Sequence, residues 1–142
     1  MQINRTMSKY QLVPLVFAQD NVAASQTNVQ LYTTEVASAA NIAIAGYTMP
    51  WAGEIIAISY DLSAAATAGT LTIGPTIGGA EATDPTLSIT TGVTGSDKTR
   101  RGVTPFAAGD IIGAEITTNG AWDGTSSDLV VVVWVILAVT GI

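Results

Sequence analysis

The chain has 142 residues, of which 11 are acidic and 5 are basic, and its net charge is −6. It contains no cysteine and no histidine, which excludes disulfides, zinc fingers, a thiol nucleophile, a Ser-His-Asp triad and an imidazole base. Charged residues make up 11% of the chain, against roughly 25% in an ordinary soluble domain. The acidic balance also argues against a nucleic-acid binder, which needs a basic surface. The length predicts a single domain.

The first part of the chain differs in composition from the rest. We expect residues 1–27 to form an extended N-terminal arm and linker, and residues 28–142 to form the domain. Arg5 and Lys9 are the basic residues of this arm. Its apolar clip consists of Leu12, Val13, Leu15, Val16 and Phe17. This pattern is similar to a weak signal peptide, but the apolar stretch is short and Pro14 interrupts it. We therefore expect the arm to be extended and to become ordered by lying against another surface.

From residue 28 onward, short strand-like runs alternate with Gly, Pro, Asp and Asn turn signals. The Ala runs at 37–40 and 64–66 are about one turn long and too short to hold a helix. The predicted strands cover residues 29–36, 42–47, 54–63, 70–77, 86–91, 103–106, 110–118 and 129–139. This spacing predicts an all-β fold, an antiparallel two-sheet jelly-roll sandwich of about eight strands.

Period-two alternation is clearest in the strand predicted over residues 54–63. Its inner face is expected to carry Ile56, Ile58, Tyr60 and Leu62. Its outer face is expected to carry Ile55, Ala57, Ser59 and Asp61. Ile55 is therefore a weaker candidate for an exposed interface.

The last predicted strand is apolar on both faces. One face holds Leu129, Val131, Val133, Val135 and Leu137. The other holds Val130, Val132, Trp134, Ile136 and Ala138. Because an antiparallel sandwich normally exposes one face of each strand to water, this strand needs two covers. One is the opposite sheet, and the other is either the N-terminal arm or, as we favour, a subunit interface around a threefold axis formed by Val130, Val132, Trp134 and Ile136. The run itself is 11 residues long, short of the ~20 that a membrane-spanning helix needs.

The remaining polar motifs indicate little chemistry. Lys98, Arg100 and Arg101 lie in a polar loop predicted over residues 92–101, which is either solvated or in contact with an acidic neighbour. The Asp123–Asp128 segment offers oxygen ligands but lacks EF-hand spacing, and we expect a plain turn.

No cluster predicts an active site. Asp110 and Glu115 would point to opposite faces of one strand, so they do not form the carboxylate pair of a glycosidase. Trp51 and Trp122 are expected to anchor loops, with a sugar-binding platform as the alternative if both lie at one end of the sandwich. We predict a protein that is not an enzyme and has no catalytic, metal or cofactor-binding residues.

Several turns and core positions resemble a known type of protein. They are Pro50 to Ser59 (PWAGEIIAIS), Ala68 to Ile73 (AGTLTI), Phe106 to Ile112 (FAAGDII) and Asp128 to Val131 (DLVV). This series resembles small jelly-roll head decoration (cement) proteins of tailed bacteriophages and related trimeric fibre-tip domains. The resemblance covers about residues 47–136 and rests on structural positions.

The resemblance implies a homotrimer on the outer surface of a virion, where it stabilises the capsid shell. The expected partners are the major capsid protein and neighbouring trimers, without nucleic acid or membrane. Its arm would contact the shell or a sister trimer. Two alternatives remain open: a receptor- or glycan-binding fibre tip, and a self-assembling shell or filament subunit.

Overall fold

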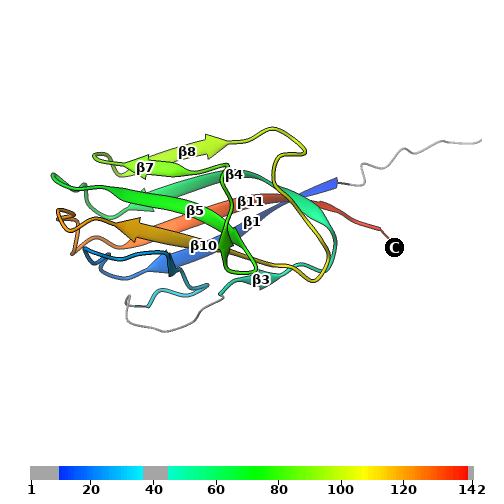
Figure 1. The fold of residues 1–142 in the computed structure, drawn as a ribbon, viewed down its shortest axis with the longest axis horizontal. Helices are drawn as coiled ribbons and strands as arrows, with labels where there is room; N and C mark the ends of the chain where they lie inside the picture. Colours follow the sequence, from blue (N-terminus) through cyan, green and yellow to red (C-terminus); the bar gives the residue numbers. More distant parts are fainter. Residues whose placement is uncertain (1–9, 37–44, 141–142) are drawn as a thin grey trace, which may run out of the picture.

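The computed structural model describes residues 10–36 and 45–140, and this part of the chain forms strands and no helix (Figure 1). The strands are β1 (Tyr10–Gln19), β2 (Val29–Gln30), β3 (Tyr47–Thr48), β4 (Gly53–Leu62), β5 (Leu71–Ile77), β6 (Ala80–Glu81), β7 (Leu87–Ile89), β8 (Thr94–Lys98), β9 (Pro105–Phe106), β10 (Ile111–Thr118) and β11 (Leu129–Ala138). The predicted all-β class is confirmed. Within the described ranges there is no helix of the length and hydropathy that crossing a membrane requires.

The strands form two antiparallel sheets. The first, here called the β11 sheet, has the order β1-β11-β4-β8, and β9 also pairs with β4. The second, the β10 sheet, has the order β2-β10-β5-β6, while β3 pairs with β10 and β7 with β5. Buried side chains from both sheets belong to one hydrophobic core. The architecture is therefore a β-sandwich, as the spacing of the strands predicts.

β11 lies in the interior of its sheet, between β1 and β4. Its odd-numbered residues point into the core: Leu129, Val131, Val133 and Val135 are fully buried and Leu137 is nearly so. Its even-numbered residues lie on the opposite face, because successive side chains of a strand alternate. The predicted assignment of residues to the two faces of this strand is confirmed.

A β-bulge in β4 changes the predicted faces of that strand. Trp134 pairs with Ala57 but Val135 pairs with Ile55, so Ile56 is an extra residue without a partner of its own. One inserted residue reverses the alternation on its far side. Ile58 and Leu62 are buried as predicted, but Ile55 is also fully buried and Ile56 is turned outward. The predictions that Ile55 lies outside and Ile56 inside are wrong for this reason.

The expected N-terminal arm is largely part of the sandwich. β1 pairs with β11 over its whole length, from Tyr10 with Ala138 to Gln19 with Leu129. Leu15 and Phe17 are buried in the core, and Val13 packs against it. The boundary at residue 27 is therefore corrected: the domain already includes residues 10–19. The physical reason is that this strand supplies inward-facing side chains which complete the core.

The segment predicted as a linker after β1 is also fixed in place. Val22 is fully buried, and its amide donates a hydrogen bond to the carbonyl of Ser127 at 2.9 Å. The side chains of Gln19 and Gln26 form a reciprocal amide pair at 2.9–3.0 Å. The first bond ties the segment between β1 and β2 to the chain just before β11, and the amide pair joins the two ends of that segment.

β8 lies inside the predicted polar loop of residues 92–101. It contains no large apolar side chain, and backbone pairing with β4 holds it at the edge of the β11 sheet. Because the strand signal depends on apolar alternation, the sequence does not show it. Several other strands are shorter than predicted, and part of the strand expected at 42–47 lies outside the described residues.

Candidate functional site

The outer face of the β11 sheet is an apolar surface on which residues from the three separately predicted sites lie. Residues paired across neighbouring strands lie side by side on one face, so the register groups them into rows. From one end to the other, the rows are Leu12 with Ile136 and Glu54; Pro14 with Trp134, Ala57 and Lys98; Val16 with Val132, Ser59 and Ser96; and Ala18 with Val130, Asp61 and Thr94. These four rows and the adjoining Ile56 are called the outer face below.

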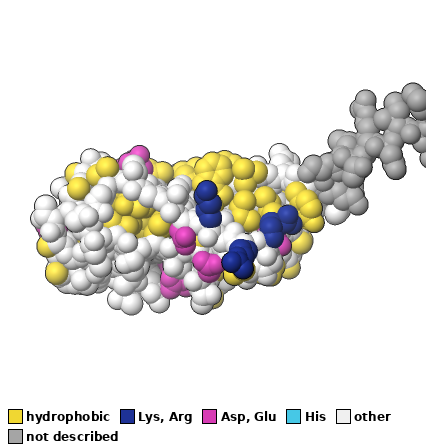
Figure 2. Space-filling view, turned by 90° about the horizontal axis from the view of Figure 1, so that it is seen from above, with side chains coloured by type: hydrophobic (Ala, Val, Ile, Leu, Met, Phe, Trp, Pro, Cys, Tyr) yellow, Lys and Arg dark blue, Asp and Glu magenta, His cyan; other side chains and the backbone are white. Residues whose placement is uncertain are grey.

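Apolar side chains on the outer face are open to solvent. Leu12 is 55% exposed, Val16 is 43% exposed and Val130 is 41% exposed. Trp134 and Ile136 are half-buried between them. Figure 2 shows hydrophobic side chains gathered beside the lysine and arginine side chains. Contiguous apolar surface of this kind marks an interaction site.

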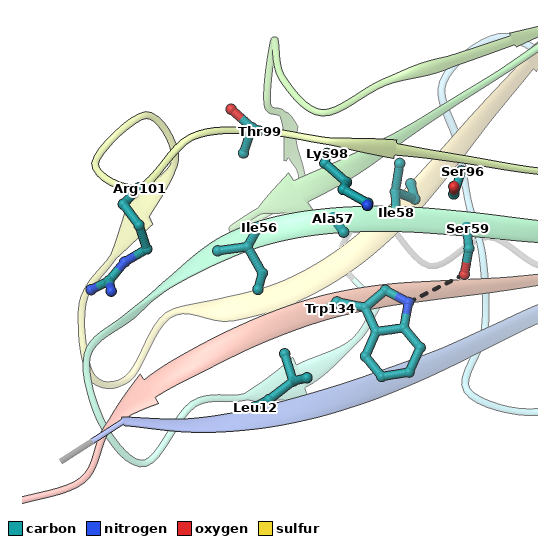
Figure 3. A pocket seen from close by; sticks show the side chains of 10 residues that line it. All are labelled: Leu12, Ile56, Ala57, Ile58, Ser59, Ser96, Lys98, Thr99, Arg101 and Trp134. Atoms are coloured by element: carbon teal, nitrogen blue, oxygen red, sulfur yellow. Dashed lines mark hydrogen bonds between the residues drawn. The ribbon is translucent and has the colours of Figure 1, made fainter. Parts of the chain in front are cut away.

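A groove of about 610 Å³ crosses the outer face. Its lining comes from four strands and the segment after β8, and includes Leu12, Ile56, Trp134, Lys98 and Arg101 (Figure 3). The Trp134 ring nitrogen donates a hydrogen bond to the Ser59 hydroxyl at 3.2 Å. The indole is thereby held in one orientation. The groove combines an apolar floor with cationic side chains along the β8 side.

Arg101 is held at one end of the outer face by two contacts. Its guanidinium forms an ion pair with Glu54, and it lies 4.5 Å from the centre of the Tyr10 ring. The hydrogen bond to Glu54, followed by one to Tyr10, raises the pKa of Arg101, so it stays charged. Lys98 makes no ion pair within the described residues. Its charge is available to a partner on this face.

The fold brings together three sets of predicted site residues that are far apart in the sequence. The predicted interface residues Val130, Val132, Trp134 and Ile136 lie on the outer face with Lys98 and with the exposed half of the apolar clip, Leu12 and Val16. Arg101 lines the groove, and Arg100 is exposed nearby without lining it.

The other half of the predicted arm contact is corrected. Leu15 and Phe17 are buried, and Val13 packs against the core, so these three side chains are not available to a capsid or a neighbour. Arg5 and Lys9 lie outside the described residues. Ile56 was missed as an outer-face residue because no sequence signal marks the bulge.

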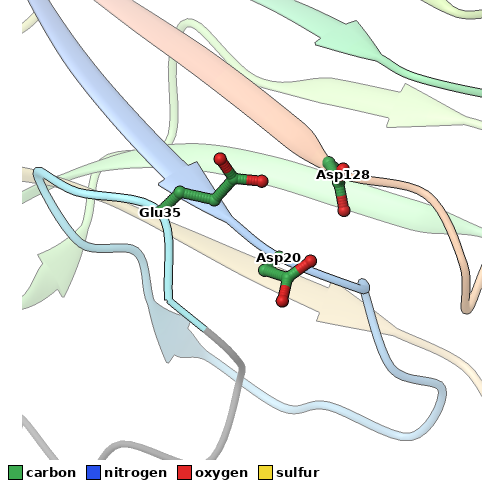
Figure 4. Close-up of side chains that lie close together, drawn as sticks. All are labelled: Asp20, Glu35 and Asp128. Carbon is green, nitrogen blue, oxygen red and sulfur yellow. The ribbon is translucent and has the colours of Figure 1, made fainter.

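Three carboxylates gather beyond the opposite end of the outer face. Oxygens of Asp20, Glu35 and Asp128 all lie within 4.8 Å of one another (Figure 4). The backbone amide of Asn21 donates to Asp128, and its side-chain amide donates to Asp20. Asp128 lies in a turn that the sequence predicts, but the three acids are far apart in the sequence, so no local pattern groups them. The group concentrates negative charge at this end of the molecule.

Asp123 has a local structural role. Its carboxylate accepts hydrogen bonds from the Thr67 hydroxyl and from the amides of Thr67 and Ala68. These bonds, the first of them above all, lower its pKa. They join two loops at one end of the sandwich, which accords with the predicted turn.

The two loop tryptophans lie at opposite ends of β11. The ring nitrogen of Trp51 donates to the carbonyl of Thr140, just after β11, whereas that of Trp122 donates to the carbonyl of Val22, which lies against the start of β11. Trp122 is also buried. A shared sugar-binding platform is therefore excluded, and each indole anchors its own loop.

Glu115 is a buried acid in the β10 sheet. Burial, followed by the nearby Glu81 carboxylate, raises its pKa to about 7. Its carboxylate accepts a hydrogen bond from the Gln30 amide at 2.9 Å, and the Gln30 carbonyl accepts one from Thr76. Glu115 lies in the other sheet from the outer face and does not contribute to the groove.

Comparison with known proteins identifies no family for this chain. The chain matches no protein-family model, and a search of curated proteins found no significant similarity.

Proposed function

We propose that this chain is a structural protein of a virion, a capsid decoration protein that binds the outside of a phage head and stabilises the shell. It acts through adhesion and has no catalytic role. The resemblance in its turns and core positions implies three copies per assembly. The outer face of the β11 sheet is the observation that carries the proposal, because it is apolar, exposed and bordered by cations.

The order of the strands supports a jelly roll. The eight main strands, numbered 1 to 8 in chain order, are β1, β2, β4, β5, β7, β8, β10 and β11. In this numbering one sheet has the order 1-8-3-6 (β1-β11-β4-β8), and the other has the order 2-7-4-5 (β2-β10-β5-β7). This alternation between sheets is the order produced by the two Greek keys of a jelly roll. It agrees with the fold that the resemblance to decoration proteins implies.

The composition supports adhesion over catalysis. The chain lacks histidine and cysteine. Two groups of acids lie outside the groove. They are the cluster of Asp20, Glu35 and Asp128, and the pair of Glu81 and Glu115. The groove itself is lined by aliphatic, aromatic, hydroxyl and cationic side chains. Such a surface fits another protein, with an apolar centre and charged groups at its rim.

The test is to locate the protein on its parent particle by electron cryomicroscopy. Density on the outer surface of the head would support the proposal. Density at a fibre tip, or filaments formed by the purified protein alone, would overturn it in favour of the corresponding alternative.

Binding to particles stripped of the protein tests the surface directly. Trp134→Asp places a charge in the apolar groove and should weaken binding at least about tenfold. Ser88→Asp, an exposed change on β7 in the other sheet, is the matched control and should bind as the unaltered chain does. Equal binding by both variants would refute a role for the outer face.

The predicted contact by Arg5 and Lys9 is tested by deleting residues 1–9. The deletion ends before β1, so the sheet remains complete. Loss of particle binding with an unchanged melting temperature would support the predicted arm contact. Unchanged particle binding would remove it from the proposal.

A further inference from the structure

The two edges of the β11 sheet differ in how their backbone groups are covered. The sheet has the order β1-β11-β4-β8, so β1 forms one edge and β8 the other. An edge strand carries a row of N–H and C=O groups that no neighbouring strand of its own sheet pairs. Whether these groups are covered decides whether a further strand can add to the sheet.

The β1 edge is obstructed. The amide of Ala18 donates to the carbonyl of Tyr32 at 2.8 Å, on the side away from β11. Backbone groups of successive residues point to alternate sides of an antiparallel strand, so the even-numbered residues of β1 face this edge. One of them is Pro14, which has no N–H to donate. The carbonyl of another, Val16, accepts a hydrogen bond from the Tyr47 hydroxyl at 3.3 Å.

The β8 edge is open (Figure 1). The carbonyl of Val93 accepts a hydrogen bond from Leu62, and the amide of Thr99 donates one to Ile56. The odd-numbered residues of this segment therefore face β4, and the even-numbered ones face away from it. The residues that face away are Thr94, Ser96 and Lys98. Within residues 10–36 and 45–140, their backbone groups make no hydrogen bond and no strand other than β4 pairs with β8.

The open edge suits one short strand. Its three outward residues are all exposed, and each offers one backbone donor and one backbone acceptor. β8 is five residues long and ends in Lys98. A short edge with a lysine discourages indiscriminate pairing with other chains. Pairing here therefore needs further contacts that select the added strand.

Charge does not supply that selection, because the cations at this end of the sheet lie among acids. Asp97 precedes Lys98 in β8 and accepts a hydrogen bond from the Thr86 amide. The Thr99 hydroxyl, just after β8, donates to the Asp84 carboxylate. Apolar contact is the remaining source of selection.

The groove beside β8 provides that contact. Ser96 and Lys98 line it, so a strand paired with β8 would run along its open side (Figure 3). Residues that face each other across paired strands share one face of the sheet. A residue paired with Ser96 would have only that short side chain between it and the groove. A long apolar side chain at this position would therefore reach the lining around Ala57 and Trp134.

A second copy of β8 does not have the required pattern. Its residues are Thr, Gly, Ser, Asp and Lys, with no large apolar side chain among them. Edge-to-edge pairing of two β8 strands would satisfy the backbone groups but leave the apolar lining of the groove uncovered. The strand that fits comes from another chain and carries apolar residues at alternate positions.

We infer that β8 accepts an extended segment of the shell protein as an additional strand of the β11 sheet, with apolar side chains at alternate positions lying over the groove. The inference rests on the proposed decoration role and deepens it by naming the form of the partner. Backbone hydrogen bonds to β8 hold the segment, and the groove selects its side chains. Each copy of an assembly takes up one such segment and keeps its outer face on the shell.

Proline at position 96 of the full-length protein tests the pairing. Ser96→Pro removes an outward N–H and places a ring at the edge, but it breaks no bond to β4, because Ser96 faces away from that strand. Ser96→Ala also loses the hydroxyl but keeps the N–H. We expect Ser96→Pro to bind stripped particles at least about tenfold more weakly than Ser96→Ala. Equal binding by the two variants, with both shown to be folded by their melting transitions, would overturn the strand addition.

A map of the decorated particle tests the same arrangement without any substitution. Electron cryomicroscopy at a resolution that separates strands should show a strand of the shell protein beside β8, at about 4.8 Å. A strand from a second copy at this place would overturn the shell protein as the partner. A β8 edge that stays uncovered in the bound protein would overturn the strand addition.

The two proposals fail in distinguishable ways. Density on the head of the particle with an uncovered β8 edge would overturn the strand addition and leave the decoration role intact. A protein absent from the head would overturn the decoration role, and with it the shell protein as the source of the strand.

Discussion

Replacing Glu115 with glutamine should remove the loss of stability that deprotonation of this buried carboxyl causes between acid and neutral pH. The pKa of Glu115 is about 7 in the folded state, raised first by burial and then by the charge of Glu81, against an ordinary value of 4.5. The folded protein therefore binds more protons than the unfolded chain between these two values. The contribution of the protonated Glu115 to stability is fully present below about pH 4.5 and is lost as the pH rises through about 7.

The size of this effect follows from the shift in pKa. At about 1.36 kcal/mol per pKa unit, a shift from 4.5 to about 7 corresponds to an upper limit of about 3.4 kcal/mol. Partial access of solvent to the carboxyl screens the interaction, and we expect about 1–2 kcal/mol. Glutamine keeps a carbonyl that accepts the Gln30 hydrogen bond but carries no charge.

Urea unfolding at a series of pH values between about 4 and 8 measures the effect. The difference in unfolding free energy between Glu115→Gln and the unaltered chain should grow by about 1–2 kcal/mol across this range. Glu81→Gln, which removes only the neighbouring charge, should reduce the slope without abolishing it. A constant difference between Glu115→Gln and the unaltered chain would refute the buried, protonated carboxyl.

The other predictions concern packing and the outer face. Phe17→Ala removes a fully buried ring that packs edge-on against Tyr47 at 5.6 Å and should lower the unfolding free energy by about 3–5 kcal/mol; a loss below about 1 kcal/mol would contradict the packing of β1 in its own domain. Gly69→Ala and Gly109→Ala both strain a left-handed backbone, but only at Gly69 would the new carbon meet the backbone of Trp122, at 2.3 Å. Gly69→Ala should therefore lower the melting temperature clearly more than Gly109→Ala, and equal losses would contradict the close approach. Trp134→Asp should weaken particle binding, and the exposed Ser88→Asp on the other sheet should leave it unchanged.

The inward and outward faces of a strand can be predicted from the sequence where side chains alternate regularly along it. In β11 the inward and outward residues follow directly from the period of two, since no irregularity falls within the strand itself. In β4 the bulge at Ile56 reverses the alternation, so the faces predicted for Ile55 and Ile56 are wrong. The side chains of β4 do not mark the inserted residue, because a bulge is defined by how the strand pairs with its neighbour. Only pairing with β11 showed that Ile55 is inside and Ile56 outside.

The candidate site depended on long-range pairing to a greater extent. Leu12, Trp134 and Lys98 were each selected from the sequence for different reasons, as an arm contact, an interface residue and a loop cation. They lie together because β1 pairs with β11, and β4 joins β11 to β8. β8 itself was not visible as a strand, since backbone hydrogen bonds hold it and its side chains carry no apolar pattern.

The sequence by itself determined the all-β class, the two-sheet sandwich and the two-sided character of the last strand, because these depend on local alternation and turn residues. The tertiary structure alone decided that residues 10–19 complete the sandwich, that the bulge turns Ile56 outward, and that apolar and cationic residues share one face. Those properties are set by which strand lies beside which, and at what register. Strand pairing is a contact between segments far apart in the chain, and no local pattern specifies it.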